Sequence, residues 1–401
     1  MAAWAREELL RRFHALQDLL AGHAALWRPA PFHEPRPAWC DTHGDFAATL
    51  LGLDDARVES LAADNGALIG LASRFIPALE TLPALLELPR RAVFAAPPDK
   101  ARLAYHVPGR KQAQVEAFAG AVEGVAAPLL EWCAGKGHLG RLLARRWGKP
   151  VLSLERDAAL CGEGERLARR AGVAQRFVAA DVLAPAAGSH LAGRHAVALH
   201  ACGDLHLELL RGAVAHRVPA VDLAPCCYYR IAAPDYQPLN ADAGLRLSRD
   251  ELHLAVTETA TAGARDRRQR DRAMAWKLAF LEWRAERGVA RGRTFKPVPA
   301  AWYGLGFAGW MARLAAREGL EPPAAADCSA WETLGRARRG EVARLELARL
   351  AFRRALELWL VLDRALFLAR HGYAVTVTEF CPRAVTPRNI LISARRPPGR
   401  D

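Results

Sequence analysis

The 401-residue sequence predicts an α/β fold in which an open, mostly parallel sheet is covered by helices on both faces. Two observations predict this fold. From residue 126 to residue 225, short apolar runs of strand length alternate with segments of helical spacing. Residues 373–396 then supply two more strand-like runs joined by a proline-containing turn. The alternation implies right-handed crossovers between parallel strands, and the last two runs complete the sheet as an antiparallel hairpin.

Before the sheet, residues 1–107 are expected to form an N-terminal helical domain. Apolar residues recur at helical spacing in REELLRRFHALQDLLAGHAALW, and residues 58–88 supply another run or two. No alternation of the kind that strands show competes with this pattern.

The sheet-forming core is expected to begin at residue 108, with a helix that opens after Pro108 and five strands before residue 255. A basic helical insert is expected over residues 256–345, and a helix and the hairpin return the chain to the core over residues 346–401. The strands are predicted at residues 126–132, 150–155, 176–181, 195–200 and 219–225, and the helices between them at 138–148, 157–172 and 205–216.

Composition indicates a folded protein with an anionic partner. Hydrophobic residues make up 51% of the chain and charged residues 25%, which excludes global disorder. The 56 Lys and Arg exceed the 43 Asp and Glu, and the resulting net charge of +13 favours RNA as a partner. An equally weighted alternative is that an arginine-rich chain carries Arg on any solvated surface.

Three features predict a cytoplasmic protein with no membrane partner. No apolar stretch reaches the roughly 18 uninterrupted residues of a membrane span. The first residues, MAAWAREELLRR, are typical of an amphipathic helix rather than a signal peptide. The eight cysteines lack the regular spacing of a secreted disulfide framework, which is typical of reduced thiols.

The basic insert carries candidate RNA-binding residues. Arginines are dense over residues 265–296, and the aromatics that follow closely are Trp302, Tyr303, Phe307 and Trp310. Basic groups beside aromatic rings suit single-stranded or looped RNA, with phosphates on Arg and bases on the rings. The alternative is a solvated helix followed by a stripe of core aromatics. The arginines expected to bind RNA are Arg265, Arg267, Arg268 and Arg272.

A polar or glycine-rich signature follows each of the first three strands. Because ligands bind at the carboxyl ends of strands in an open α/β sheet, these positions are candidate site residues. The glycines after the first strand let the backbone approach a ligand, Glu155 can accept both hydroxyls of a ribose, and Asp181 lies in reach of an adenine amino group. A glycine-rich turn followed by two acids at this spacing is the layout of an S-adenosylmethionine site. The expected cofactor-binding residues are Glu131, Cys133, Gly135, Lys136, Gly137, His138, Leu139, Glu155, Arg156, Asp181, Val182 and His200.

A dinucleotide site competes with this interpretation, because residues 135–140 match the G-x-G-x-x-G pattern. Glu131 lies just before the loop, where it can take the α-amino group of a methyl donor. Together with Asp181 and the terminal hairpin, it favours S-adenosyl-L-methionine as the cofactor. A structural turn without a ligand is the third interpretation.

The fourth and fifth strands end where such enzymes place the reactive atom of the substrate. One interpretation is a zinc site formed by His200 with the three nearby cysteines, although adjacent cysteines rarely converge on one metal. Another is a nucleophilic cysteine, which Pro225-Cys226 suggests. The preferred interpretation is a polar pocket wall without a metal, in which buried thiols act as small hydrophobes. The expected substrate-pocket residues are Cys202, Gly203, Cys226, Cys227 and Tyr228.

Three sequence blocks carry a family resemblance. GKGHLGRLLA, HACGDLHLELLR and PCCYYR resemble the methyltransferase-like proteins that share GKGHL, HACGDL and CCY blocks. They are also similar to the tRNA enzymes that methylate a ribose 2'-hydroxyl in the acceptor stem, which carry a Gly-Lys-Gly loop, an HLCG block and a CCH block. The terminal TPRNILISA is similar to the return strand of both groups, so that the resemblance covers residues 108–230 and 370–396.

The resemblance implies a Rossmann-like class I methyltransferase with a seven-stranded sheet, S-adenosyl-L-methionine as cofactor, and tRNA or rRNA as substrate. Two departures limit what it implies. Tyr228 stands where the tRNA enzymes have His, and residues 1–107 lack their small Cys/His zinc modules. The resemblance therefore implies methyl transfer, and does not single out ribose methylation of the acceptor stem.

Methyl transfer from a sulfonium requires few catalytic side chains, because the donor is already activated and proximity and orientation dominate. An acceptor hydroxyl needs a base, and the expected catalytic residues are His200, Asp204 and Lys136, of which His200 has the most suitable ordinary pKa. A histidine that merely closes the strand is the alternative. The other functions that remain open are methylation of a protein or small molecule, RNA binding without catalysis, and NAD-dependent chemistry.

Overall fold

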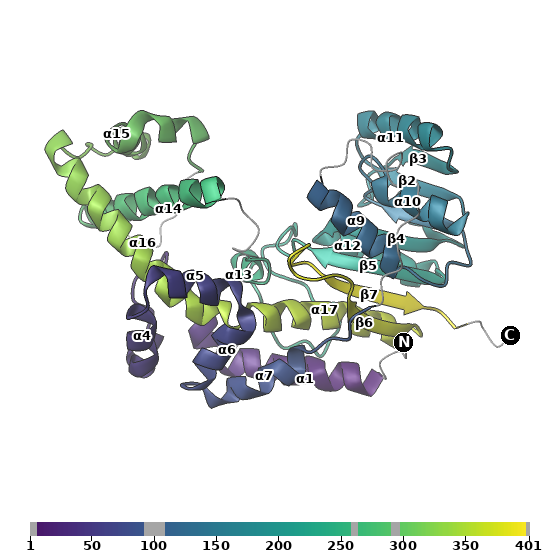
Figure 1. Ribbon diagram of the computed structural model, residues 1–401, viewed down its shortest axis with the longest axis horizontal. Helices are drawn as coiled ribbons and strands as arrows, with labels where there is room; N and C mark the ends of the chain where they lie inside the picture. Colours follow the sequence, from purple (N-terminus) through teal and green to yellow (C-terminus); the bar gives the residue numbers. More distant parts are fainter. Residues whose placement is uncertain (1–5, 92–108, 258–263, 290–296, 398–401) are drawn as a thin grey trace. The chain divides into compact units, whose positions relative to one another are not determined.

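A computed structural model describes residues 6–91, 109–257, 264–289 and 297–397 (Figure 1). The chain divides into two compact units. The sheet unit consists of Met1–Gly22, Leu82–Thr257 and Arg353–Asp401, and the helical unit consists of His23–Thr81 and Glu258–Phe352. The helices that precede the sheet in the sequence are therefore divided between the two units.

The strands are β1 Leu129–Trp132, β2 Val151–Glu155, β3 Gln175–Ala179, β4 His195–Cys202, β5 Ala220–Cys226, β6 Ala374–Glu379 and β7 Ile390–Arg395. They form one sheet of seven strands in the order β3-β2-β1-β4-β5-β7-β6. Strands β1 to β5 run parallel, and β7 is antiparallel to its neighbours β5 and β6. Every residue of β1 and β5 is buried, as helices on both faces require. This architecture confirms the predicted Rossmann-like class I fold with its terminal hairpin.

The helices of the sheet unit are α1 Arg6–Gly22, α7 Leu82–Leu86, α9 Gly109–Ala121, α10 His138–Trp147, α11 Ala158–Ala171, α12 Asp204–Ala215, α13 Arg249–Leu254 and α17 Arg353–Arg370. Helices α9 and α10 pack on one face of the sheet through a core that includes Phe118, Leu143 and Val197. Helices α12 and α17 cover the opposite face (Figure 1). Helix α1 packs on α17, where the Phe13 ring stacks on Trp359 with the centroids 5.3 Å apart.

A buried polar cluster joins three strands inside the sheet. The Asp222 carboxylate on β5 lies 2.6 Å from His195 Nε2 on β4. It also accepts hydrogen bonds from Ser393 Oγ at 2.5 Å and Arg395 Nη2 at 2.8 Å, both on β7. Burial opposes ionisation of this carboxyl, but Arg395 and His195 outweigh it and hold the pKa of Asp222 below its usual range. The cluster fixes β5 between a parallel and an antiparallel neighbour.

The helical unit contains α2 Ala24–Trp27, α3 Trp39–Thr42, α4 Gly44–Leu51, α5 Asp55–Ala63, α6 Asn65–Ser73, α14 Ala264–Ala285, α15 Gly306–Glu318 and α16 Cys328–Leu350. The long helix α16 contacts α2, α4, α5, α6, α14 and α15, so that two distant parts of the sequence pack together. Asp54 caps α5 by accepting the Arg57 N–H at 2.7 Å.

None of the described helices, in either unit, has the length and apolarity needed to cross a membrane.

The aromatic residues of the insert form a core within the helical unit. Phe307 and Trp310 on α15 are 8% and 0% exposed and pack against Trp276 on α14. Trp302 and Tyr303 lie partly buried against the same cluster. For Phe307 and Trp310, the structure therefore favours core packing over base stacking, because their faces are covered.

The arginines expected to bind RNA lie near the start of α14. Arg267, Arg268 and Arg272 are exposed, and the Arg272 guanidinium lies 5.2 Å from the centroid of the Trp276 ring. The side chain of Arg265 lies outside the described residues. Three of the four expected arginines therefore lie on a solvated surface.

Candidate active site

The strand-end residues selected from the sequence meet at one edge of the sheet. Because β1 to β5 are parallel, their carboxyl ends share this edge. Cys133 follows β1, Glu155 ends β2, and Asp181 lies just after β3. Cys202 ends β4 and Cys226 ends β5. This is the region in which open α/β sheets bind their ligands.

The loop between β1 and α10 uses its glycines for two purposes. Gly135 and Gly137 have positive φ angles of 55° and 66°, which favour glycine. A Cβ at Gly137 would lie 2.3 Å from Gln175 Nε2, and a Cβ at Gly140 would lie 2.5 Å from Glu131 Oε2. A Cβ at Gly135 would meet nothing within 4 Å. Packing under the loop therefore requires Gly137 and Gly140, whereas Gly135 faces open space.

Glu131 lies buried beneath this loop. Its carboxylate accepts hydrogen bonds from Ser153 Oγ at 2.8 Å and Gln175 Nε2 at 3.3 Å. The Gln175 amide also donates to Gly137 O at 3.1 Å. Ser153 on β2 and Gln175 on β3 therefore both hold Glu131, and Gln175 also holds the loop. Burial raises the pKa of Glu131 to about 7, although Ser153 and the Gly140 backbone oppose the shift. The carboxylate that was expected to hold the donor's amino group thus has protein partners under the loop.

Glu155 joins the loop to the end of β2. Its Oε2 accepts the Gly135 N–H at 2.9 Å, and its Oε1 accepts the Asp157 N–H at 3.0 Å. The side chain is only partly buried. The carboxylate therefore lies beside the open face of Gly135, as a ribose-binding acid requires.

Cys133 lies between the ends of several strands. Burial, followed by the nearby side chains of Glu155, Cys202 and Asp181, raises the pKa of its thiol to about 12. Groups from the ends of three other strands therefore act on this thiol. Asp181 itself is exposed, and its Oδ1 accepts the Leu183 N–H at 3.0 Å.

The remaining residues expected to bind the cofactor differ in exposure. Leu139 and Val182 are each 4% exposed, whereas Arg156 is exposed. His138 is buried, and its Nδ1 lies 2.5 Å from Arg141 Nη2. Because arginine only donates, the imidazole accepts this hydrogen bond and is neutral. Burial, followed by the charge of Arg141, lowers the pKa of His138 to about 4.

Two of the three expected catalytic residues have partners within the protein. Lys136 Nζ forms an ion pair with Glu163 Oε2 on α11 at 2.5 Å. Asp204 Oδ2, at the start of α12, accepts the Ala232 N–H at 2.7 Å. Lys136 is therefore paired with a partly exposed acid, and one carboxylate oxygen of Asp204 is held by a backbone N–H.

His200 lies in an irregular part of β4. The pairing of β4 with β5 shifts between Leu199 and Cys202, and His200 has a positive φ of 72°. Its side chain is exposed. Partial loss of hydration, followed by repulsion from Lys111, lowers the pKa of the ring. His200 therefore presents its side chain to solvent from the end of β4.

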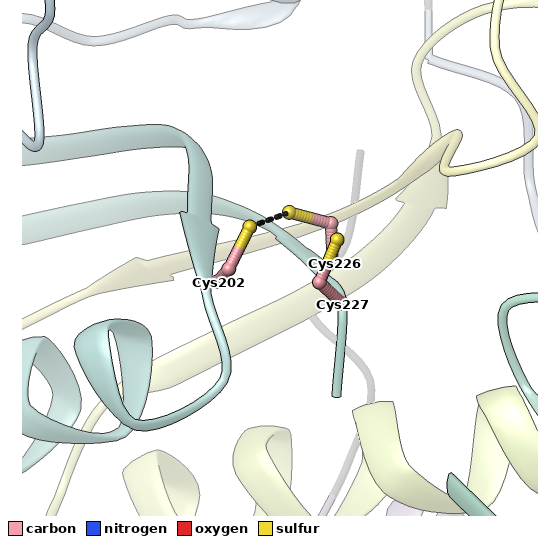
Figure 2. Close-up of side chains that lie close together, drawn as sticks. All are labelled: Cys202, Cys226 and Cys227. Atoms are coloured by element: carbon pink, nitrogen blue, oxygen red, sulfur yellow. Dashed lines mark hydrogen bonds between the residues drawn. The ribbon is translucent and has the colours of Figure 1, made fainter. Parts of the chain in front are cut away.

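The thiols of Cys202, Cys226 and Cys227 converge at the ends of β4 and β5 (Figure 2). Their sulfur atoms all lie within 4.8 Å of one another, and Cys202 Sγ lies 3.3 Å from Cys226 Sγ. Contacts from the Cys202 and Cys226 thiols lower the pKa of Cys227 against the effect of burial, and Arg230 lowers it further. The pKa of Cys226 is raised by its contacts with the other two thiols and by burial. Cys227 is therefore the thiol that ionises before Cys226.

Gly203 and Tyr228, both expected in the substrate pocket, have structural roles. Gly203 has a φ of 55°, and a Cβ there would lie 1.9 Å from Arg230 O, so that only glycine fits. Tyr228 is 0% exposed, and the Arg364 guanidinium lies 5.0 Å from the centroid of its ring. Tyr228 therefore faces the core rather than a surface that a substrate reaches.

His253, which no sequence pattern singled out, lies beside the thiols. Its ring stacks on Tyr229 with the centroids 3.7 Å apart and the planes 19° apart. Tyr229 acts on Cys227 by hydrogen bonding, and Cys227 acts electrostatically on His253. Because His253 comes from α13, no local motif could have linked it to the site.

The end of β4 is held from the core by His206. Its Nε2 accepts a hydrogen bond from Arg364 Nε at 2.7 Å, so that its Nδ1 donates to Ala201 O at 2.9 Å. Burial, followed by the charge of Arg364, lowers the pKa of His206 well below its usual range and keeps the ring neutral. Arg364 Nη1 also donates to the Tyr236 hydroxyl at 3.0 Å, and that hydroxyl donates to Asp363 Oδ2 at 2.5 Å. The thiol-bearing strand end is thus fixed by a buried network rooted in α17.

Residues 110–234 match the family model of a methyltransferase domain. The matched segment runs from the first turn of α9 to just beyond β5 and includes the glycine loop, Glu155, His200 and the three thiols. No curated protein matches the chain. The match and the seven-stranded fold together support a methyltransferase.

Proposed function

We propose that this protein is an S-adenosyl-L-methionine-dependent methyltransferase that acts on RNA, with tRNA and rRNA as the substrate classes. The observation that carries the proposal is the hydrogen bond from the Gly135 N–H to Glu155 at the ends of β1 and β2. It sets a carboxylate beside a glycine whose Cβ position is open. A nucleoside ligand uses such a pair, because it needs an acid for its ribose and a backbone that it can approach closely. The methyltransferase match over residues 110–234 favours the sulfonium donor as that nucleoside.

In this proposal, three residues contact the donor's nucleoside. Glu155 accepts its ribose hydroxyls, Asp181 accepts the adenine amino group, and Val182 packs beside the base. The bound donor supplies an activated methyl group, so that the protein contributes mainly orientation and exclusion of water. Glu131 is a positioning residue, since it holds the loop through Gln175.

His200 is the base that we propose for an acceptor hydroxyl. Its ring is exposed at the end of β4, whereas Lys136 and Asp204 are engaged by other groups of the protein. An imidazole in this place accepts the hydroxyl proton as the methyl group is transferred.

Charge supports RNA as the acceptor. The chain has a net charge of +13, and Arg267, Arg268 and Arg272 are exposed on one helix. Exposed cations bind phosphates by releasing counterions, without regard to sequence. The choice of tRNA or rRNA follows from the resemblance of the three sequence blocks to methyltransferase-like proteins and to tRNA ribose methyltransferases.

Isothermal titration calorimetry with S-adenosyl-L-methionine tests the donor site. We expect the wild-type protein to bind the donor and Glu155→Ala to bind it about 10- to 100-fold more weakly, because an ionised hydrogen-bond acceptor is lost. Glu208→Ala, which removes a partly exposed acid on α12 that pairs with Arg211, is the control and should bind like the wild type. Preference for NADH in a parallel titration, or equal affinities of the wild type and Glu155→Ala, would overturn the donor assignment.

Mass spectrometry of nucleosides tests the acceptor. RNA from a strain that lacks this protein is compared with RNA from its parent, and the strain is complemented with the wild type or Glu155→Ala. We expect one methylated nucleoside to disappear and to return with the wild type alone. An unchanged set of nucleosides, in the presence of donor binding, would overturn the RNA acceptor and leave a protein or a small molecule.

A further inference from the structure

We propose that Cys202, Cys226 and Cys227 together bind one zinc ion through their thiolates, with the fourth coordination position open toward the acceptor side of the active site. The metal site itself follows from the geometry of the three thiols. The assignment of the open position to the acceptor rests on the proposed methyltransferase function.

The spacing of the three sulfur atoms suits a tetrahedral ion. All three lie within 4.8 Å of one another, and Cys202 Sγ lies 3.3 Å from Cys226 Sγ. Zinc binds thiolates at about 2.3 Å, and tetrahedral angles then place the sulfurs roughly 3.8 Å apart. The 3.3 Å pair lies inside this value, and the 4.8 Å upper bound lies about 1 Å beyond it. Binding therefore requires movements of roughly 1 Å or less, which side-chain rotation supplies.

Unusual backbone at the two strand ends is what makes the thiols converge. Adjacent residues on a strand point to opposite faces, which would separate the thiols of Cys226 and Cys227. Cys227 instead has a positive φ of 42°, and this turn brings its sulfur back toward that of Cys226 (Figure 2). On β4, the irregularity at His200 sets Cys202 directly opposite Cys226. Positive φ costs a non-glycine residue about 1–2 kcal/mol. Of the four described non-glycine residues with positive φ, His200 and Cys227 lie at this cluster.

The number and exposure of the ligands indicate an open site. Within the described part of the chain, no further His, Cys, Asp or Glu joins the three thiols at this spacing, and this excludes His200 as a preformed fourth ligand. Structural zinc sites carry four protein ligands, whereas catalytic sites carry three and keep one position for water or substrate. Cys226 is buried, but Cys202 and Cys227 are partly exposed, so that the open position lies on the solvent side.

The surroundings of the cluster suit this ion and this role. Three thiolates and one divalent ion carry a net charge of −1, and the Arg230 guanidinium acts electrostatically on Cys202 and Cys227. Cys202 also acts electrostatically on Cys133. Glu155 and Asp181, on the side of the proposed donor site, act electrostatically on the same thiol. An ion held by the three thiols therefore lies next to the proposed donor site, where the acceptor atom must be.

Metal analysis tests the site directly. The full-length protein is purified under reducing conditions and dialysed, and its zinc is measured by inductively coupled plasma mass spectrometry. We expect about one zinc per chain in the wild type, and a loss of at least ten-fold in Cys202→Ser, Cys226→Ser and Cys227→Ser. Cys328→Ser, in the helical unit, removes a buried thiol outside the cluster and should keep the full zinc content.

Cobalt substitution keeps the proposal testable if a serine variant does not fold. Chelator-treated wild type is titrated with Co²⁺, and we expect intense thiolate-to-cobalt charge-transfer absorption with one equivalent bound. Wild-type protein that holds no zinc and gives no cobalt spectrum would overturn the proposal. A Cys202–Cys226 disulfide in protein prepared without an oxidant would overturn it as well.

Failure of this inference is distinguishable from failure of the proposed function. A protein that binds S-adenosyl-L-methionine but no metal disproves the zinc site alone. A protein that holds zinc on the three thiols but binds no methyl donor disproves the methyltransferase assignment and leaves the metal site intact.

Discussion

At the residue scale, the three glycines in the loop before α10 and in its first turn meet two different requirements. Gly137 and Gly140 are needed because Gln175 and Glu131 pack under the loop, whereas the Cβ position of Gly135 is open. The G-x-G-x-x-G pattern alone does not reveal this difference, because the packing partners come from β1 and β3. It follows that only one of the three glycines is placed for contact with a ligand.

Gly135→Ala and Gly137→Ala should therefore separate binding from stability. In Gly135→Ala, we expect donor affinity to fall by about ten-fold or more, since the methyl group enters the open space, with a stability loss of about 1–2 kcal/mol from positive φ. In Gly137→Ala, the clash with Gln175 and Phe177 adds about 1–3 kcal/mol of destabilisation. Urea unfolding and calorimetry check both values. Equal stability losses in the two variants would contradict this division.

Glu131 predicts a pH dependence of stability. Its folded pKa of about 7 exceeds the ordinary 4.5, so that the folded state binds the proton more tightly than the unfolded state. The resulting stabilisation is full below pH 4.5 and is lost as the pH rises through 7. The loss amounts to about 3 kcal/mol.

Glu131→Gln keeps the side chain neutral and should remove this dependence. Between pH 4.5 and pH 7, we expect the unfolding free energy of the variant to rise relative to that of the wild type, by about 3 kcal/mol. Taking the difference cancels the titration of neighbours that both proteins share, such as His138. A difference that stays constant across this range would show that Glu131 is ionised throughout.

The sequence was sufficient to place the strand-end residues but not to assign their partners. Glycines, Glu155 and Asp181 could be predicted because each directly follows a recognisable apolar run. Ser153 and Gln175 could not, since single polar residues on apolar strands form no pattern. The burial of Tyr228 could not be predicted either, because it depends on the positive φ of Cys227, and the alternation of side chains along a strand does not reveal such a turn.

At the scale of elements, α14 and α15 are joined by an ion pair inside the helical unit. Arg284 is 0% exposed, and its Nη1 donates to Glu318 Oε2 at 3.1 Å. The Glu318 side chain is 11% exposed, so that it depends on this partner for compensation of its charge. A pair in such surroundings is costly to break from one side.

Arg284→Met should destabilise the helical unit by about 3–5 kcal/mol, because it leaves the Glu318 carboxylate without its cation. The double variant Arg284→Met/Glu318→Leu should recover most of this loss, since both charges are then absent. Thermal unfolding followed by circular dichroism measures the effect. A double variant as unstable as the single one would show that packing of Arg284, rather than its charge, is the stabilising factor.

The exposed face of α14 predicts the salt dependence of RNA binding. Replacing Arg267, Arg268 and Arg272 by Gln should lower the slope of log affinity against log salt by about 2, at about 0.7 per phosphate contact on single-stranded RNA. Fluorescence anisotropy with tRNA over a range of KCl concentrations measures the slope. Arg11→Gln/Arg36→Gln, which changes exposed arginines outside α14, is the control. An unchanged slope in the triple variant would remove α14 from the RNA-binding surface.

The strands of the sheet could be predicted because each one is a short apolar run that is visible within its own segment of the sequence. The five parallel strands and the terminal hairpin occur where apolar runs of strand length predict them, because both faces of the sheet are covered. The aromatic stripe of the insert was ambiguous, since core and RNA-stacking rings share one spacing. Its burial depends on α14 and α15 packing together, which is a tertiary property.

At the scale of the whole molecule, each compact unit is assembled from separated segments. Helix α1 packs on α17 in the sheet unit, and α4, α5 and α6 pack on α16 in the helical unit. Composition shifts along the sequence cannot reveal such partnerships, because they join segments hundreds of residues apart. The N-terminal helices therefore serve two different cores.

We expect a deletion to leave a soluble protein only if it removes all segments of one compact unit together. Deletion of 258–352 alone removes α16 and exposes the apolar faces of α4, α5 and α6, so that we expect aggregation. Deletion of both 23–81 and 258–352, with short Gly/Ser linkers, should leave a soluble sheet unit that still binds the methyl donor. Size-exclusion chromatography and calorimetry distinguish the two outcomes. A single deletion that is monomeric and as stable as the double one would contradict the division into units.

The position of β7 has a consequence for how the protein is made. It is the last of the seven strands in the sequence, yet it lies between β5 and β6 and supplies the Ser393 and Arg395 contacts to Asp222. While the ribosome is still short of Ile390, a nascent chain presents an unpaired edge on β5 and a buried acid without its cation. A premature stop codon just before Ile390 would therefore be as damaging as one far upstream. The central sheet can be completed only after synthesis has passed its final strand, so that the nascent chain exposes an unpaired strand edge until then.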